Sequence, residues 1–285
     1  MRLGIYIRSF RLRTLPLSMS GIVLGGGLAG YAGVFSWPVF VLALCTTVSL
    51  QILSNLSNEL GDALKGTDAD QHGREAYGLQ SGQITVAEMR RIIGLFVALC
   101  ILFGTALIWT AFGSLFTIQS IVFLVLGLLA IIGAMTYTLG RHSYGYMGLG
   151  DLGVFLFFGL LSTIGGYYLQ AQDVTAEIVW MGVAIGMPSV GVLNLNNIRD
   201  MRNDRLHGKR TFASLLGQTG GRAYHTILLV ACLLLMVVYG HYWTLLVLPV
   251  WAWHLWYVWT HEEQLDRQMP VLMLSTFCVA LLALL

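Results

Sequence analysis

Long apolar runs, separated by shorter polar stretches, fill this chain from about position 15 to its last residue. A helix that crosses a bilayer needs about 20 mainly apolar residues. On that rule the pattern predicts an all-α fold, a single membrane domain over residues 1–285 with nine spanning helices. We expect these spans at 15–33, 37–58, 92–112, 117–137, 149–170, 178–198, 224–240, 242–260 and 269–285.

Composition supports an integral membrane protein. The 285 residues are 56% hydrophobic and only 11% charged, whereas soluble chains carry about 25% charged residues. The net charge of +2 is too small to indicate a nucleic-acid partner. We expect the apolar surface of the protein to contact membrane lipid. The four cysteines lie within apolar runs without metal-ligand spacing, which is typical of small membrane-helix residues.

The positions of the charges predict the orientation. If the N-terminus is cytoplasmic, nine spans place all 16 Lys and Arg residues on the cytoplasmic side. Of the charged residues, only Asp173 and Glu177 then lie on the external side. This segregation follows the positive-inside rule, and adding or removing one span would destroy it.

Two similar stripes of polar residues close the second and sixth expected spans. The first stripe is Asn55, Asn58 and Asp62, and the second is Asn197, Asp200 and Asp204. In both, the second and third residues lie three and seven positions after the first. Residues three, four and seven apart share one face of a helix.

The chemistry of these stripes suits a hard metal ion. Carboxylate and amide oxygens without His or Cys favour Mg²⁺, which completes its shell with water and substrate phosphate. Nearby Lys65, Arg199, Lys209 and Arg210 can donate hydrogen bonds to phosphate oxygens. A solvated charged loop is the simpler alternative, but it leaves the asparagines within an apolar helix end unexplained.

Several motifs resemble the UbiA superfamily of intramembrane prenyltransferases, and within it the branch that acts on 1,4-dihydroxy-2-naphthoate. The similarity covers nearly the whole chain. Glu59 departs from the family pattern, which usually has Asp there. The matching segments are Arg13–Pro16, Asn58–Asp68, Ser81–Gly82, Tyr137–Thr138, Tyr144–Asp151, Phe155–Gly159, Asn197–Asp200 and Gly208–Gly217.

The resemblance implies helices around a central cavity that opens to the cytoplasm, in the bacterial inner membrane. It implies Mg²⁺-dependent transfer of a polyprenyl chain from its diphosphate to an aromatic acceptor. Tyr137, Tyr144 and Tyr146 would stabilise the allylic cation, with Tyr137 as a catalytic residue beside Asp62, Asp200 and Asp204. The metal ligands would be Asn58, Glu59, Asp62, Asp68, Asp200 and Asp204, and the diphosphate ligands Lys65, Arg141, Asn197, Arg199 and Lys209.

The acceptor is expected to be dihydroxynaphthoate, attacked at its carboxyl-bearing carbon with loss of CO₂. Arg13 would meet the acceptor carboxylate and Asn55 a ring hydroxyl. Prenylation of 4-hydroxybenzoate or homogentisate is the nearest alternative. A cation transporter and a noncatalytic lipid-binding scaffold are alternatives from other classes. The prenyl chain length, the number of Mg²⁺ ions and the oligomeric state stay open.

Overall fold

A computed structural model describes residues 2–66, 78–141, 143–261 and 264–285. Within these ranges the chain is helical, with one isolated bridge between Met147 and Arg210. The helices are α1 (Arg2–Phe10), α2 (Leu15–Tyr31), α3 (Trp37–Lys65), α4 (Val86–Phe112), α5 (Ile118–Thr136), α6 (Gly150–Val154), α7 (Ser162–Ala171), α8 (Ala176–Leu206), α9 (Phe212–Val238), α10 (Leu248–Thr260) and α11 (Gln268–Leu282). Short 3₁₀ turns cover Leu12–Thr14, Tyr144–Tyr146, Tyr242–Val247 and Leu265–Arg267, and a π-helical segment, Phe155–Leu161, joins α6 to α7.

Helices occupy all nine expected positions in the described ranges, but seven of them are long and apolar enough to cross a membrane alone. The two others are α2, with 17 residues, and α10, with 13. The 3₁₀ turn from Tyr242 leads directly into α10, so the two together cover the range expected for the eighth span. Seven spans are thus supported by length and composition, and the nine-span topology stays a prediction.

Four helices extend beyond the apolar run that predicted them. Helix α3 continues from position 58 to Lys65, and α8 continues from position 198 to Leu206. Helix α4 begins earlier than expected, at Val86, and α9 begins at Phe212 with a short segment that a kink at Gly217 (φ +74°) separates from the rest of the helix. A helix satisfies its own backbone hydrogen bonds whether its side chains meet lipid or water, so hydropathy detects only the apolar part. The extensions of α3 and α8 carry the acidic members of the two stripes, Asp62, Asp200 and Asp204.

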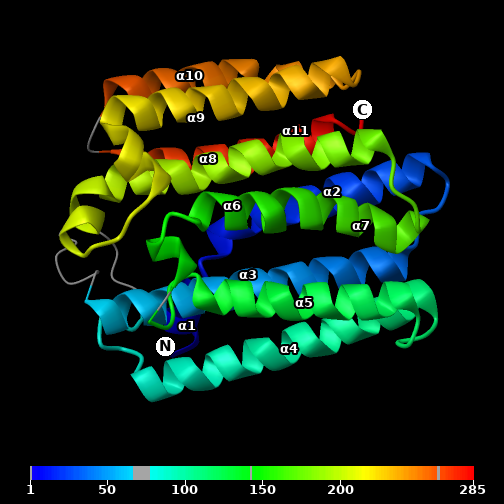
Figure 1. Cartoon of the computed structure of the whole chain (residues 1–285), viewed down its shortest axis with the longest axis horizontal. Coiled ribbons are helices and arrows are strands. Elements are labelled where there is room, and N and C mark those ends of the chain that lie inside the picture. The colour runs from blue at the N-terminus through cyan, green and yellow to red at the C-terminus, as the bar shows by residue number, and fades with distance from the viewer. Residues whose placement is uncertain (1, 67–77, 142, 262–263) are drawn as a thin grey trace.

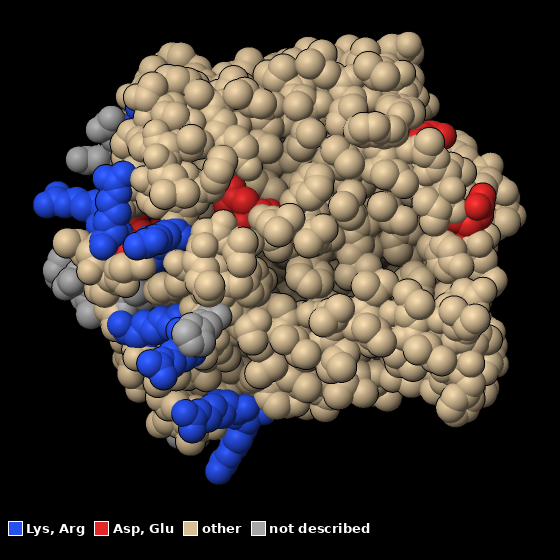
Figure 2. Space-filling view, in the orientation of Figure 1, with Lys and Arg blue, Asp and Glu red and all other residues tan. Residues whose placement is uncertain are grey.

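The long helices run side by side, and the charged ends of α3 and α8 lie at the same end of the molecule (Figure 1). On the face shown in Figure 2, every visible Lys and Arg gathers at that end. This distribution agrees with the segregation of charge in the sequence, although it does not itself identify the side of the membrane.

Glycines allow the helices around the centre to approach closely. A Cβ at Gly25 of α2 would lie 2.4 Å from the Thr163 carbonyl oxygen of α7. A Cβ at Gly159 would lie 2.5 Å from Gly186 Cα, where the π-helical segment crosses α8. Small residues at helix crossings are typical of membrane proteins, and here they hold α2, α7 and α8 together around the central space.

Candidate active site

A cavity of about 640 Å³ lies between α2, α3, α5, the α6–α7 segment and α8. Its lining is polar near the carboxyl ends of α3 and α8, where Asn58, Asp62, Asp200 and Asp204 meet it. Elsewhere α4, α5 and the π-helical segment contribute apolar side chains to the lining, such as Leu107, Phe123, Phe157 and Leu161. One chamber therefore offers a polar end and an apolar interior.

The first polar stripe reaches the cavity because its members share one face of α3. Asn58 and Asp62, one helical turn apart, both line the cavity. The Thr138 hydroxyl donates to Asn58 Oδ1 at 3.0 Å. Gly61 allows this contact, since a Cβ there would lie 2.7 Å from the Thr138 side chain. The loop after α5 thereby fixes the Asn58 amide.

The second stripe reaches the cavity with a different member than expected. Asp200 and Asp204 line it and are largely buried, and Asn196 lines it in place of Asn197. Asn196 lies four residues before Asp200, a full turn along the same face, whereas Asn197 is buried outside the cavity lining.

Arg199 holds Asp200 in a charged cluster at the cavity wall. Its guanidinium donates two hydrogen bonds to the Asp200 carboxylate, at 2.8 Å and 2.6 Å. It also bonds the side chains of Asn196 and Asp266. The bidentate geometry fixes the carboxylate orientation. The predicted diphosphate ligand Arg199 therefore lines the cavity while engaged with two carboxylates.

Tyr146 connects the two stripes. Its hydroxyl donates to Asp62 Oδ1 at 3.0 Å. The Lys65 ammonium lies 3.7 Å from the centre of its ring, and that of Lys209 lies 5.6 Å away. Lys209 in turn reaches Asp204, with Nζ 3.2 Å from Oδ1. Asp62 and Asp204 thus share one cluster of tyrosine and lysine side chains.

Backbone contacts hold that cluster in shape. The Arg210 amide donates to the Tyr146 carbonyl at 3.1 Å, and the Lys209 amide donates to the Asp204 carbonyl at 2.8 Å. Gly208 adopts a φ of +69°, a value that other residues rarely take, so the chain can reverse directly after α8. The loops after α5 and α8 are therefore joined over the polar end of the cavity.

Two tyrosine rings pack together beside the carboxylates. Tyr137 and Tyr144 meet edge to face, with ring centres 5.3 Å apart. Burial raises the pKa of Tyr137 well above its usual value, and repulsion from Tyr144, Asp151, Asp62 and Asp204 raises it further. Burial also raises the pKa of Tyr144 to about 12. Both phenols are therefore neutral at physiological pH and present π faces rather than phenolates.

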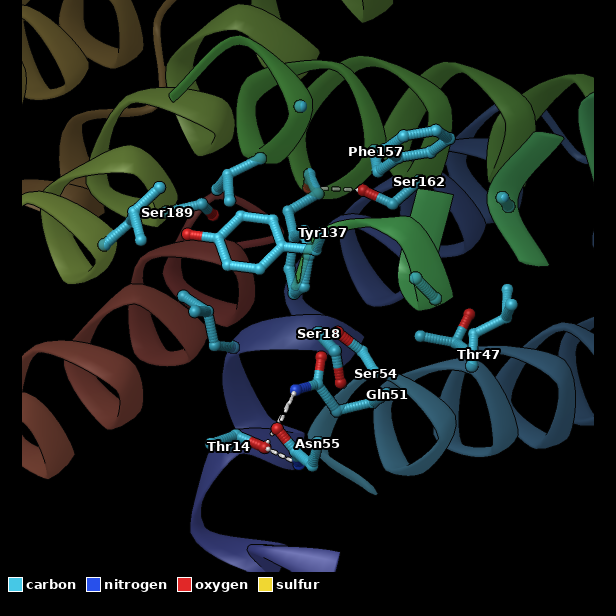
Figure 3. Close-up of a pocket in the computed structure, with 18 of the residues that line it drawn as sticks. Thr14, Ser18, Thr47, Gln51, Ser54, Asn55, Tyr137, Phe157, Ser162 and Ser189 are labelled. Atoms are coloured by element: carbon cyan, nitrogen blue, oxygen red, sulfur yellow. Dashed lines mark hydrogen bonds between the residues drawn. The ribbon is translucent and has the colours of Figure 1, made fainter. Parts of the chain in front are cut away.

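A network of neutral polar side chains lies on α3 and the turn before α2 (Figure 3). Gln51 Nε2 donates to Thr14 Oγ1 at 3.0 Å and to Asn55 Oδ1 at 3.2 Å. Asn55 Nδ2 donates to Thr14 Oγ1 at 3.0 Å and to the Phe10 carbonyl at 2.9 Å. The network ties the chain around Arg13 to α3, and the Tyr137 ring lies across the cavity from it.

Most of the predicted site residues line the cavity. They are Arg13, Asn55, Asn58, Asp62, Tyr137, Arg199, Asp200, Asp204 and Lys209. Lys65 does not line it but lies directly behind Tyr146, where it also bonds Ser143.

The other predicted residues lie elsewhere. Glu59 is fully buried outside the cavity lining, and its Oε1 accepts the Leu79 amide at 2.7 Å, so it holds the segment before α4. Arg141 is exposed and outside the lining. Asn197 faces away from the cavity lining, as noted above. Asp68 lies outside the described residues, so its part in metal binding stays a prediction.

The donor set fits Mg²⁺ of the kind that binds together with a phosphorylated substrate. In the described ranges, no three Asp, Glu, His or Cys side chains gather closely enough to hold a metal unaided. Mg²⁺ usually takes one or two protein carboxylates and fills its shell with water and phosphate oxygens. Asp204 Oδ2 is buried and accepts no hydrogen bond from the described residues, although Lys209 Nζ lies 3.2 Å away. Such an oxygen is suited to a cation.

The sequence analysis did not select several polar residues of the cavity wall, among them Gln51, Asn196 and Asp266. Gln51 lies one turn before Asn55, so extending the first stripe backwards by four residues would have found it. The same extension from Asp200 leads to Asn196. Asp266 belongs to no periodic stripe, and its partner Arg199 lies 67 positions away in the chain.

Comparisons with known proteins agree with this architecture. A relative from Escherichia coli named 1,4-dihydroxy-2-naphthoate octaprenyltransferase is 42% identical over 82% of this chain and 76% of its own length. A protein of the same name from Haemophilus influenzae is 37% identical over 95% of this chain and 90% of its own.

Solved structures show the same fold at low sequence identity. A UbiA homologue from Aeropyrum pernix superposes with a TM-score of 0.74 at 18% identity, covering 95% of this chain and 97% of that one. A UbiA homologue from Archaeoglobus fulgidus bound to GPP and Mg²⁺ superposes with a TM-score of 0.60 at 15% identity, covering 97% and 99%. The model of the UbiA prenyltransferase family matches residues 19–281. By its sequence, as by its fold, this chain belongs to the UbiA prenyltransferase family.

Proposed function

We propose that this protein transfers a polyprenyl chain from its diphosphate to 1,4-dihydroxy-2-naphthoate, with release of diphosphate and CO₂. The observation that carries the proposal is the single cavity that has both polar stripes at one end and apolar walls beyond them. The names of the bacterial relatives support this acceptor, and the Archaeoglobus homologue supports Mg²⁺.

The polar end suits the diphosphate. Mg²⁺, when bound with the substrate, would neutralise the charge that grows on diphosphate as the allylic C–O bond breaks. Asp62, Asp200 and Asp204 would hold it, with Asn58 as an amide ligand. Lys209 would donate a hydrogen bond to a phosphate oxygen, with Lys65 adding positive charge from behind Tyr146. Glu59, Asn197 and Arg141 have no place in this assignment.

The aromatic faces suit the other fragment. When the C–O bond breaks, its electron pair leaves with the diphosphate and an allylic cation remains. Tyr137 and Tyr144 are neutral and line the cavity beside the carboxylates, so their faces can stabilise that cation by about 0.5–2 kcal/mol each. The apolar lining would accommodate the isoprenoid units nearest the reacting carbon, where each buried CH₂ contributes about 0.8 kcal/mol.

The acceptor would approach from the Arg13 side. Its carboxylate would pair with the Arg13 guanidinium, which lines the cavity. A ring π pair forms the new C–C bond at the carboxyl-bearing carbon. Loss of CO₂ then returns the C–C bonding pair to the ring and restores aromaticity. Because CO₂ leaves in place of a proton at that carbon, no strong external base is required there.

The test is turnover by the purified protein in detergent, with octaprenyl diphosphate as donor. We expect Mg²⁺-dependent consumption of dihydroxynaphthoate, release of labelled CO₂ from the carboxyl-labelled acceptor, and no reaction in excess EDTA. 4-Hydroxybenzoate and homogentisate serve as competing acceptors. A lack of turnover with dihydroxynaphthoate, alongside turnover with either of the others, would refute the proposed acceptor.

A further inference from the structure

Gln51 is a buried side chain whose hydrogen-bonding capacity is only half used. It is 8% exposed and lies on the cavity-facing side of α3. Both Nε2 hydrogens are engaged, one with Thr14 and one with Asn55. Its carbonyl oxygen, Oε1, is buried and accepts no hydrogen bond from any residue that the structure describes. Buried polar atoms normally have partners, so an unmatched one beside a cavity indicates a missing donor.

The network around Gln51 determines which way its amide points. The Thr14 hydroxyl donates to the Arg11 carbonyl at 2.9 Å, so its oxygen can only accept from Gln51 and Asn55. Asn55 Oδ1 likewise needs a donor, and Nε2 of Gln51 supplies it. Reversing the amide would place Oε1 against two acceptors. The free acceptor of Gln51 is therefore a consequence of the hydrogen-bond pattern rather than of an arbitrary amide assignment.

Asn55, for which the sequence suggested a bond to a ring hydroxyl, is already engaged through both groups of its amide. Its Nδ2 donates to Phe10 and Thr14, and its Oδ1 accepts from Gln51. These bonds hold the segment that carries Arg13 against α3, and they leave Asn55 Oδ1 with one further lone pair. Gln51 Oε1, on the same face of α3, accepts no hydrogen bond from the described residues, so it is the acceptor with the greater need of a donor.

We propose that Gln51 Oε1 accepts a hydrogen bond from a ring hydroxyl of the aromatic acceptor and thereby selects hydroxylated rings. The inference rests on the proposed function, since it concerns the second substrate of that same cavity. The location is suitable: Gln51 is hydrogen bonded to Thr14, the neighbour of Arg13, and Tyr137 lies across the cavity (Figure 3). An acceptor whose carboxylate meets Arg13 would thus lie with its ring beside Gln51.

The side chains around Gln51 agree with a phenolic ligand rather than an anion. Thr14, Ser18, Ser54 and Asn55 are all neutral and line the cavity there. Lone carbonyl oxygens accept hydrogen bonds and would repel a carboxylate. Positive charge comes from Arg11 and Arg13 of the segment before α2, which also line the cavity. The acceptor site would thus have a cationic position for the acid and an accepting position for a hydroxyl. A site built to bond a hydroxyl rejects analogues that lack it.

The test combines loss of the residue with loss of the hydroxyl. Dissociation constants would be measured anaerobically, in detergent and without prenyl donor, for 1,4-dihydroxy-2-naphthoate, 1-hydroxy-2-naphthoate and 4-hydroxy-2-naphthoate. Wild-type protein should bind one monohydroxy analogue at least about tenfold more weakly than the parent, the size expected for a single hydrogen bond. In Gln51→Leu that ratio should fall close to one, because the partner oxygen is gone.

Gln119→Leu is the matched control, since it makes the same change on an exposed residue of α5 outside the cavity, and it should keep the wild-type ratios. Equal ratios in wild-type and Gln51→Leu protein, for both analogues, would overturn the inference. A general loss of packing would weaken all three ligands equally and would give that same negative result. Failure of wild-type protein to bind dihydroxynaphthoate at all would instead refute the proposed function.

Discussion

The hydrogen bond from Tyr146 to Asp62 gives the sharpest test of how the carboxylates are held. Tyr146→Phe removes one hydroxyl that lies 3.0 Å from Asp62 Oδ1 and keeps the ring against which Lys65 packs at 3.7 Å. A hydrogen bond to a charged group contributes about 1.5–3 kcal/mol. If that bond orients Asp62 for the transition state, its loss should lower kcat/KM about 10- to 150-fold.

The assay is initial-rate prenyl transfer at saturating Mg²⁺, with thermal unfolding measured in parallel. Tyr257→Phe is the control, because it removes a comparable hydroxyl bond, 3.1 Å to Gln264 Oε1, on an exposed part of α10. It should leave the rate within about twofold of wild type. A Tyr146→Phe rate equal to that of the control would refute the view that Tyr146 orients Asp62.

Three further outcomes follow from the site. Asp62→Ala and Asp204→Ala should each lower turnover by at least about 100-fold while leaving membrane insertion unchanged, measured by turnover and by membrane fractionation; activity near wild type in either would contradict the metal assignment. Tyr137→Phe should keep most activity and Tyr137→Leu should lose about 2- to 30-fold, because the ring face rather than the hydroxyl is needed; equal rates of the two variants would exclude the cation role. Since the pKa values of Tyr137 and Tyr144 are raised, both stay protonated through pH 9, so Tyr137→Phe and wild type should give parallel pH–rate profiles from pH 7 to 9, and a wild-type limb absent from the variant would contradict this.

The apolar pattern predicted the positions of the helices well and their ends poorly. Hydropathy reports contact with lipid, whereas a helix ends where its backbone bonds end. At Gly66 a φ of +70° closes α3, eight residues after its apolar run ends. A glycine after the last helical residue is a common C-terminal signal, and here it marks the boundary better than hydrophobicity does.

Spacing along a helix predicted which stripe residues meet the cavity to within one residue. The offsets that identified Asn58 and Asp62 place both on the cavity-facing side of α3, as the structure shows. The same offsets chose Asn197, whereas Asn196 lines the cavity, because steps of three and four residues are both compatible with one face. Only the packing of α8 against its neighbours decides between them.

Contacts between distant segments were beyond reach of the sequence. Glu59 looks like a ligand in a polar stripe, and its bond to the Leu79 amide depends on where the segment before α4 returns. The pairing of Asp266 with Arg199 likewise depends on the packing of the 3₁₀ turn Leu265–Arg267 against α8. Such residues carry no periodic signal, so their partners emerge only from the tertiary arrangement.

The bridge between Met147 and Arg210 joins the two loops that lie over the polar end of the cavity, one after α5 and one after α8. Gly148, with a φ of +81°, and Gly208, with a φ of +69°, allow the chain to turn close to each of the two bridge residues. Replacing either glycine by a residue that disfavours a positive φ would therefore disturb the loop after α5 and the loop after α8 together. A change in either loop would therefore displace Tyr146 and Lys209 together, because each lies next to a residue of the bridge.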